Sequence, residues 1–215
     1  MVPHILNIDD AIWRCRVRFV LLLAVTRELA ETALALAKMG ATVVMVVRNQ
    51  EKGEKALSEI VVQIGNKSVS LMLCDMSSKA SIRDFAREFK KKYSRLDVLV
   101  NNAGGEFNKR EVTHEGFERT FAVDYLAPFL LIHELLDLLK ASAPSRIINV
   151  SSGLAKNGKV NFDDLQSVKD YKGMHVYSNA KLMLMMFTYE LSRRLVASGV
   201  TANVLMPGFV ATDLG

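Results

Sequence analysis

The stretch VLVNNAG, residues 98–104, is a short apolar run that ends in two asparagines, an alanine and a glycine. A continuous run of branched apolar residues is typical of a strand buried on both faces, as in parallel sheets. Two similar runs end at Ser151-Ser152 and Pro207-Gly208. Because the carboxyl ends of parallel strands share one edge of a sheet, the sequence predicts that these polar segments meet there.

Strand-like runs alternate with helical patterns along the chain. Strands are predicted at 19–25, 43–47, 68–73, 98–100, 146–150 and 202–205, and helices at about 28–39, 50–63, 78–93, 115–140 and 175–197. Such alternation indicates β-α units with right-handed crossovers. The predicted fold is therefore α/β: a doubly wound, mainly parallel sheet with helices on both faces.

The composition indicates one well-buried domain, which we place over residues 1–215, half of them hydrophobic. The net charge of +5 is modest, and the basic residues are spread over helical faces such as 90–92, so we expect no nucleic-acid partner. Cys15 and Cys74 provide no disulfide framework, which fits a reducing, cytoplasmic compartment.

The N-terminal region loosely imitates a short signal peptide, because Arg14, Arg16 and Arg18 precede the apolar run 19–25. A first β-strand is the better interpretation. No stretch approaches the ~20 apolar residues of a spanning helix. We expect a soluble chain without a transmembrane segment, and peripheral membrane attachment stays open.

Tyr177 and Lys181 stand one helical turn apart in the predicted helix 175–197. Alone, such a pair is commonplace on amphipathic helices. Together with Ser152 and residues 102–104 at strand ends, it predicts a site that moves a proton. A phenol titrates near pH ~10, and a lysine on the same helical face lowers that pKa.

These motifs make the chain, from about residue 32 to residue 215, resemble the short-chain dehydrogenase/reductase family, particularly its retinol-dehydrogenase-like branch. The family motifs are NNAG at 101–104, Ser152, YSNAK at 177–181 and PG at 207–208. The branch is indicated by NFDDLQ at 161–166 and FTYEL at 187–191. The resemblance implies a Rossmann-type oxidoreductase domain, truncated after Gly215, where the family has a further strand and a substrate lid.

The resemblance also implies the chemistry: interconversion of a small-molecule alcohol and its carbonyl by hydride transfer. Tyr177 would protonate the substrate oxygen as hydride arrives from the cofactor. Lys181 would lower the pKa of Tyr177 and hold the nicotinamide ribose. Ser152 would donate a hydrogen bond to the substrate oxygen, whereas Ser151 is interpreted as a structural hydroxyl.

Arg48 ends the second predicted strand, where an acidic residue would bind a ribose 2′-hydroxyl and an arginine suits a 2′-phosphate. The expected cofactor is therefore NADP rather than NAD. By resemblance, Asp75 contacts adenine, and Thr212 contacts the nicotinamide carboxamide or the phosphates. The remaining cofactor-binding residues expected from the motifs are Asn102, Ala103, Gly104, Tyr177, Lys181, Pro207 and Gly208.

One family motif is missing. The pattern T-G-x-x-x-G-x-G aligns with residues 22–29, where Leu23, Arg27 and Leu29 occupy the glycine positions. Those glycines allow a tight turn and let backbone N–H groups approach a pyrophosphate at a helix N-terminus. Side chains obstruct that approach, and Glu28 adds negative charge, which Arg27 offsets only in part.

A shifted reading frame would explain the missing glycines. Residues 25–30, VTRELA, can be encoded GTA ACT CGG GAA TTG GCA, and translation from the third base gives Asn-Ser-Gly-Ile-Gly. We therefore hypothesise that the N-terminal region is an out-of-frame translation, with the family's frame resuming near Glu31. Different codons at 28–30 in the coding DNA would contradict this hypothesis.

A second departure is Asp124, where the family usually has an asparagine that helps to hold a proton-relay water. A carboxylate accepts hydrogen bonds but does not donate as an amide does, and its charge would perturb Lys181 if the two approach. No metal site is predicted, because no companions at ligand spacing accompany His114, His133 or His175.

Two other functions stay open. The first is a catalytically silent relative that acts only by association, through a homodimer formed by helices 115–140 and 175–197; the degenerate residues 23–29 favour it. The second is a nucleotide-sugar epimerase or dehydratase, which shares the Tyr and Lys chemistry. Such enzymes need a substantial C-terminal substrate domain, so we rank this function last.

Overall fold

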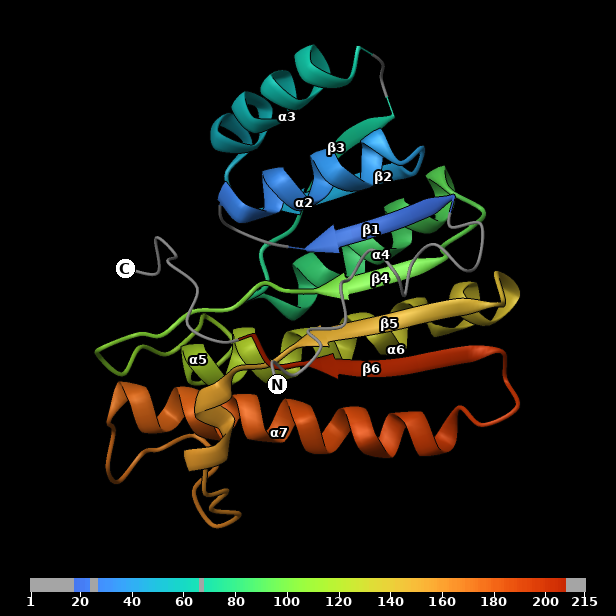
Figure 1. Ribbon diagram of the computed structural model, residues 1–215. Coiled ribbons are helices and arrows are strands. Elements are labelled where there is room, and N and C mark those ends of the chain that lie inside the picture. Colours follow the sequence, from blue (N-terminus) through green and yellow to red (C-terminus); the bar gives the residue numbers. More distant parts are fainter. Residues whose placement is uncertain (1–17, 24–26, 66–67, 208–215) are drawn as a thin grey trace, which may run out of the picture.

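The computed structural model describes residues 18–23, 27–65 and 68–207 (Figure 1). Six parallel strands form one sheet in the order β3-β2-β1-β4-β5-β6. The strands are β1 Phe19–Leu23, β2 Thr42–Val47, β3 Val69–Leu73, β4 Val98–Asn101, β5 Ser145–Val150 and β6 Val200–Leu205. The longer helices are α2 Arg27–Lys38, α3 Gln50–Ile64, α4 Lys79–Lys92, α6 Ala127–Ala141 and α7 Gly173–Arg194.

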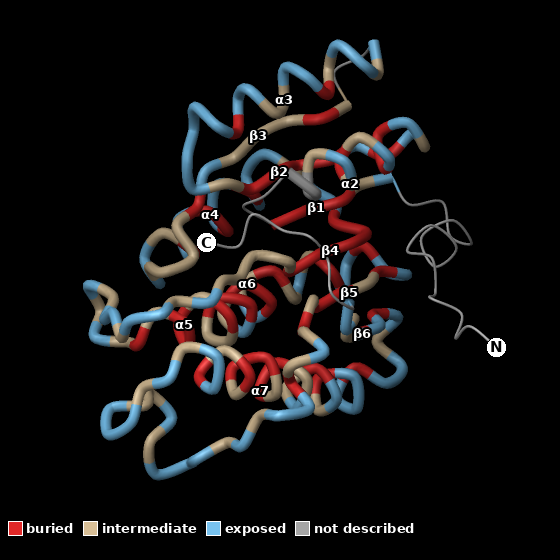
Figure 2. The backbone as a smooth tube through the Cα atoms, turned by 60° about the vertical axis from the view of Figure 1, so that its left-hand side comes forward, coloured by how far each residue is buried: buried red, intermediate tan, exposed pale blue. Residues whose placement is uncertain are grey.

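The sheet has two apolar faces, because successive side chains of each strand point in opposite directions. In β1, Val20 and Leu22 join the core under α2 and α3, while Leu21 and Leu23 join the core under α4 and α6. All four are at most 2% exposed. Figure 2 shows the central strands as buried, with exposed residues on the outer helices. The predicted doubly wound sheet is confirmed.

The strand order reverses between β1 and β4, which lie side by side in the middle of the sheet. In sheets of this class, ligands bind beyond the carboxyl ends of the strands at this point. Helix α7 packs beside β5 and β6, and Leu191 of this helix, with Leu195 directly after it, joins the same core as α4 and α6. The described parts of the segments that the sequence predicts to meet, at the ends of β4, β5 and β6, therefore share one edge of the sheet.

The amino end of β1 is fixed by a buried carboxylate. One Asp97 oxygen accepts the backbone N–H groups of Arg18 and Phe19, both at 2.9 Å, and the other accepts from the Arg95 side chain at 2.6 Å. These bonds tie β1 to β4 at the edge opposite the predicted site. They explain how the first strand keeps its place in the sheet.

One predicted helix is wrong in its details. The expected helix 115–140 begins only at Arg119, because the Glu118 carboxylate caps the chain there by accepting from the N–H groups of Thr120 and Phe121. A three-residue α-helix, α5 Arg119–Phe121, leads into the π-helix η1 Ala122–Leu126 and then α6. Among the described residues, no helix is both long and apolar enough to cross a bilayer.

Candidate active site

Helix α7 is docked onto the end of β5 through Lys181. The Lys181 ammonium, on a side chain that is 4% exposed, donates to the Val150 carbonyl at 3.3 Å. In return, the Ser151 hydroxyl donates to the Lys181 carbonyl at 2.9 Å. The lysine is therefore held at the carboxyl edge of the sheet, and Ser151 has the structural contact expected of it.

Tyr177 lies one turn before Lys181 on α7, as their spacing predicts. The Lys181 Nζ lies 5.5 Å from the centroid of the Tyr177 ring, and Tyr177 itself is half-buried. A cation at this distance favours the ionised form of a nearby phenol. The geometry thus brings together the two residues that the sequence assigns to proton transfer.

Ser152 follows β5 and precedes the 3-10 helix η2, Gly153–Asn157. Its hydroxyl oxygen accepts from the Leu154 N–H at 3.2 Å, and the residue is half-buried. A hydroxyl that accepts this bond still has its own hydrogen to donate. Ser152 can therefore donate to a substrate oxygen at this edge.

Asp124 lies in the π-helix η1, a kind of local widening that often occurs at functional sites. One carboxylate oxygen accepts from the Gly105 N–H at 2.9 Å, and the other lies 3.7 Å from Lys181 Nζ. Burial raises the pKa of Asp124 to about 6, against the lowering effects of Lys181 and the Gly105 N–H, while nearby Glu118 raises it further. The expected approach of Asp124 to Lys181 is present.

The loop after β4 completes this arrangement. A Cβ at Gly104 would lie 2.7 Å from Lys181 Nζ and 3.0 Å from an Asp124 oxygen, so only glycine fits between them without displacing a charged group. The backbone N–H of Asn102 donates a hydrogen bond to the carbonyl of Leu23, the last residue of β1, at 3.2 Å. Residues 102–104, including Ala103, are half-buried at the sheet edge.

Of the remaining cofactor-binding candidates, the structure describes Arg48, Asp75 and Pro207 but not Gly208 or Thr212. Arg48 is exposed directly after β2, and the half-buried Asp75 accepts from the N–H and hydroxyl of Ser77 through one oxygen, at 2.9 and 2.7 Å. Pro207 is exposed just beyond β6. Gly208 and Thr212 lie outside the described residues.

The degenerate glycine segment is described only at its ends. Leu23 is the buried last residue of β1, residues 24–26 lie outside the described residues, and α2 begins at Arg27. The residues that would face the nicotinamide end of a dinucleotide fit that role, because the Lys181 ammonium lies beside Gly104, within 5.5 Å of the Tyr177 ring, and binds the end of the strand that leads to Ser152.

Sequence reasoning missed a buried amide network beneath the site. Asn101 donates to Asn149 at 2.8 Å, and Asn149 donates to Thr188 on α7 at 2.9 Å. The network joins β4, β5 and α7, so it sets the position of the helix that carries Tyr177. The signal was present, since an asparagine inside the apolar run RIINV must find a partner when buried.

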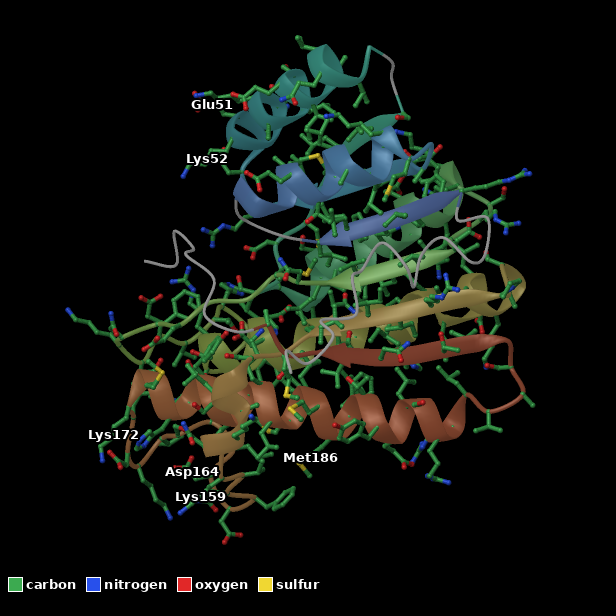
Figure 3. The ribbon with its side chains drawn as sticks, in the orientation of Figure 1. Glu51, Lys52, Lys159, Asp164, Lys172 and Met186 are labelled. Atoms are coloured by element: carbon green, nitrogen blue, oxygen red, sulfur yellow. The ribbon has the colours of Figure 1, made fainter. Side chains whose placement is uncertain are left out.

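A second missed residue is the fully buried Glu118. Besides capping α5, Glu118 donates its backbone N–H to the side-chain oxygen of Gln166 at 3.0 Å. Its carboxylate accepts a long hydrogen bond from the Tyr171 hydroxyl at 3.5 Å. Tyr171 also donates to the Phe107 carbonyl at 2.7 Å. These bonds attach the insert between Ser152 and Tyr177 to the loop that follows β4. Figure 3 shows Lys159 and Asp164 of this insert beside α7.

Comparisons with known proteins show the family to which the chain belongs. The family model described as short chain dehydrogenase matches residues 29–215, and the chain belongs to that family. Its relatives include retinol dehydrogenase 13 of Mus musculus, 46% identical over 86% of this chain and 56% of that protein. Retinol dehydrogenase 11 of Homo sapiens is 44% identical over 86% of this chain and 58% of that protein. The resemblance to the retinol-dehydrogenase-like branch is confirmed, and the chain spans about half the length of these relatives.

Solved structures share the fold. An uncharacterized protein from Mycobacterium paratuberculosis has a TM-score of 0.78 and 34% identity, covering 92% of this chain and 70% of that one. The Pseudomonas aeruginosa RhlG/NADP active-site complex has a TM-score of 0.74 and 25% identity, covering 91% of this chain and 74% of that one. Both alignments extend over nearly the whole chain, so the sheet order and the site elements belong to a common architecture.

Proposed function

We propose that the protein is an NADP-dependent oxidoreductase that interconverts an alcohol and an aldehyde or ketone. The observation that carries this proposal is the convergence of Lys181, the Tyr177 ring and the Ser152 segment at the carboxyl ends of β4 and β5. When bound, the nicotinamide cofactor supplies or accepts the hydride. The family and its retinol dehydrogenase relatives make a lipophilic alcohol or aldehyde the first substrate class to test.

The chain's own residues divide the remaining work. Ser152 donates a hydrogen bond to the substrate oxygen and orients the reacting carbon. Tyr177 gives a proton to that oxygen during reduction and takes one during oxidation. The Lys181 cation favours the phenolate that the oxidation direction needs. Gly104 has no side chain, which leaves room for the Lys181 ammonium beside the Asp124 carboxylate.

Arg48 supports NADP as the cofactor, since a guanidinium pairs with a 2′-phosphate in a bidentate manner. Calorimetric titration with NADPH and NADH tests this directly. We expect tighter binding of NADPH, and Arg48→Ala should weaken NADPH binding while leaving NADH binding unchanged. Equal binding of both nucleotides by the unaltered chain would contradict the assignment.

Turnover is tested by following NADPH oxidation with a panel of aldehydes and ketones, retinal among them. Reduction of at least one carbonyl compound, and its loss in Tyr177→Phe, would support the proposal. Failure of the chain to bind either nucleotide would instead support a catalytically silent relative.

The alternative of a silent relative that acts by association has its own support. Apolar residues remain exposed on α6 and α7: Phe129 is 45%, Met186 49% and Tyr189 60% exposed. Figure 3 shows Met186 on the side of α7 away from the sheet. A homodimer through these helices would cover them. Sedimentation of the unaltered chain and of Tyr189→Asp distinguishes a dimer from a monomer, and a monomeric unaltered chain would contradict this alternative.

A further inference from the structure

The Lys181 ammonium lies near two groups that both interact with its charge. The first is the Tyr177 ring, whose centroid is 5.5 Å from Nζ. The second is an Asp124 oxygen, 3.7 Å from Nζ. Both members of the ion pair are buried, with side chains that are 4% and 0% exposed. In such surroundings water screens the charges weakly, so each group strongly affects the other.

The orientation of the Asp124 carboxylate is fixed rather than adaptable. The Gly105 N–H binds one oxygen at 2.9 Å. The absence of a side chain at Gly104 leaves the space in which Nζ and that carboxylate meet. The second oxygen has no hydrogen-bond partner among the described residues. It therefore faces Lys181 as an unshared negative charge.

Few other charges act on this pair. The titratable groups that interact with Asp124 are Lys181, from α7, and Glu118, which caps α5 and raises the pKa of Asp124. On α7, Tyr177 is an ionisable group whose ring centroid lies 5.5 Å from Lys181 Nζ. The net charge felt by the Tyr177 phenol therefore depends chiefly on whether Asp124 carries its proton.

We propose that Asp124 is a positioning residue that controls, through Lys181, how readily Tyr177 releases its proton. This inference rests on the proposed function, in which Tyr177 moves the proton. When Asp124 is ionised, it offsets the Lys181 charge and the phenolate is poorly stabilised. When Asp124 takes a proton from solvent, the full lysine charge acts on Tyr177. The family's asparagine would leave that charge uncompensated at every pH.

Burial supports the direction of this switch, because it raises the pKa of Asp124 to about 6 and so brings its titration toward neutral pH. Tyr177 should consequently have a higher pKa in this chain than in its Asp124→Asn variant. The expected difference is about one unit, the lower part of the range for an adjacent charge. At a given alkaline pH, the variant would hold roughly ten times more phenolate for each neutral phenol.

The test uses the protein without cofactor or substrate. The chain is labelled with ¹³Cζ-tyrosine, the signal of Tyr177 is assigned with Tyr177→Phe, and its titration is followed by NMR between pH 7 and 12. We expect Asp124→Asn to lower the Tyr177 pKa by about one unit. Asp97→Asn is the matched control, because it neutralises another buried aspartate at the opposite edge of the sheet; it should leave the Tyr177 pKa unchanged.

A double-mutant cycle separates action through Lys181 from direct repulsion. In a Lys181→Met background, Asp124 loses the cation that lowers its pKa and keeps its proton to higher pH, so Asp124→Asn should move the Tyr177 pKa by much less. The folding of each variant is checked by its circular dichroism spectrum. An unchanged Tyr177 pKa in folded Asp124→Asn overturns the inference, as does an equal shift with and without Lys181. Neither result depends on nucleotide binding or turnover, so failure here is distinct from failure of the proposed oxidoreductase activity.

Discussion

The two halves of the sheet's carboxyl edge differ in how their residues depend on one another. Beyond β4 and β5, Gly104, Asp124 and Lys181 occupy adjoining space, and each position restricts the other two. Beyond β1 and β2, Leu23 is simply buried in the core and Arg48 is exposed. The strand under the degenerate glycine segment keeps its full register with both neighbours. The sheet therefore keeps its strand pairing up to Leu23, although the sequence there departs from the family's glycine pattern.

The largest expected effect concerns the β4–β5 half. Tyr177→Phe removes the proposed proton donor while keeping the ring beside Lys181, so turnover of a carbonyl substrate should fall by roughly 10²–10⁴-fold. Steady-state NADPH oxidation measures the loss. Tyr189→Phe, an exposed tyrosine on the same helix, is the control and should retain turnover. Equal activity in both variants would remove Tyr177 from the mechanism.

The next effect concerns the β1–β2 half. Replacing Leu23, Arg27 and Leu29 by glycine should tighten NADPH binding by about a hundredfold, because one or two charge-assisted bonds from backbone N–H groups to phosphate become available. Calorimetry measures the change. The control Glu31→Gly/Ala35→Gly places glycines in the same helix, α2, without restoring the motif. Unchanged binding in the restored variant would show that the missing glycines do not limit NADPH binding.

A smaller effect should follow from the amide network under the β4–β5 half. Asn149→Ala leaves the Asn101 amide without its partner, and Asn101 Oδ1 already lacks one among the described residues. We expect the free energy of unfolding to fall by about 2 kcal/mol, measured with urea. Asn203→Ala, on the neighbouring strand but exposed, should change it by less than about 0.5 kcal/mol.

The smallest effect is a pH dependence. The folded-state pKa of Asp124, about 6, lies above its ordinary value of 3.8, so the folded protein binds this proton more tightly than the unfolded chain. The resulting stabilisation is complete below about pH 4 and is lost as the pH rises through about 6. Over that window, the unfolding free energy of the unaltered chain should fall relative to Asp124→Asn by about 1–2 kcal/mol. Parallel curves for the two proteins would contradict the raised pKa.

The sequence predicted the sheet and the helices well, because buried parallel strands have an unmistakable apolar pattern. It failed at the start of the helix expected from residue 115. Glu118, which caps that helix, is held by Gln166 and Tyr171, which lie about 50 residues further along the chain. No local propensity encodes such contacts.

By itself, the sequence determined the family, the strand edge on which the site lies, and the pairing of Tyr177 with Lys181, since spacing along one helix fixes their common face. Only the tertiary structure decided that Asp124 meets Lys181 at 3.7 Å with Gly104 beside them. These residues come from α7, a π-helix and a strand-end loop. Their contact exists only when the sheet and both helices are packed together, so the charge that Lys181 offers to Tyr177 is a property of the folded molecule.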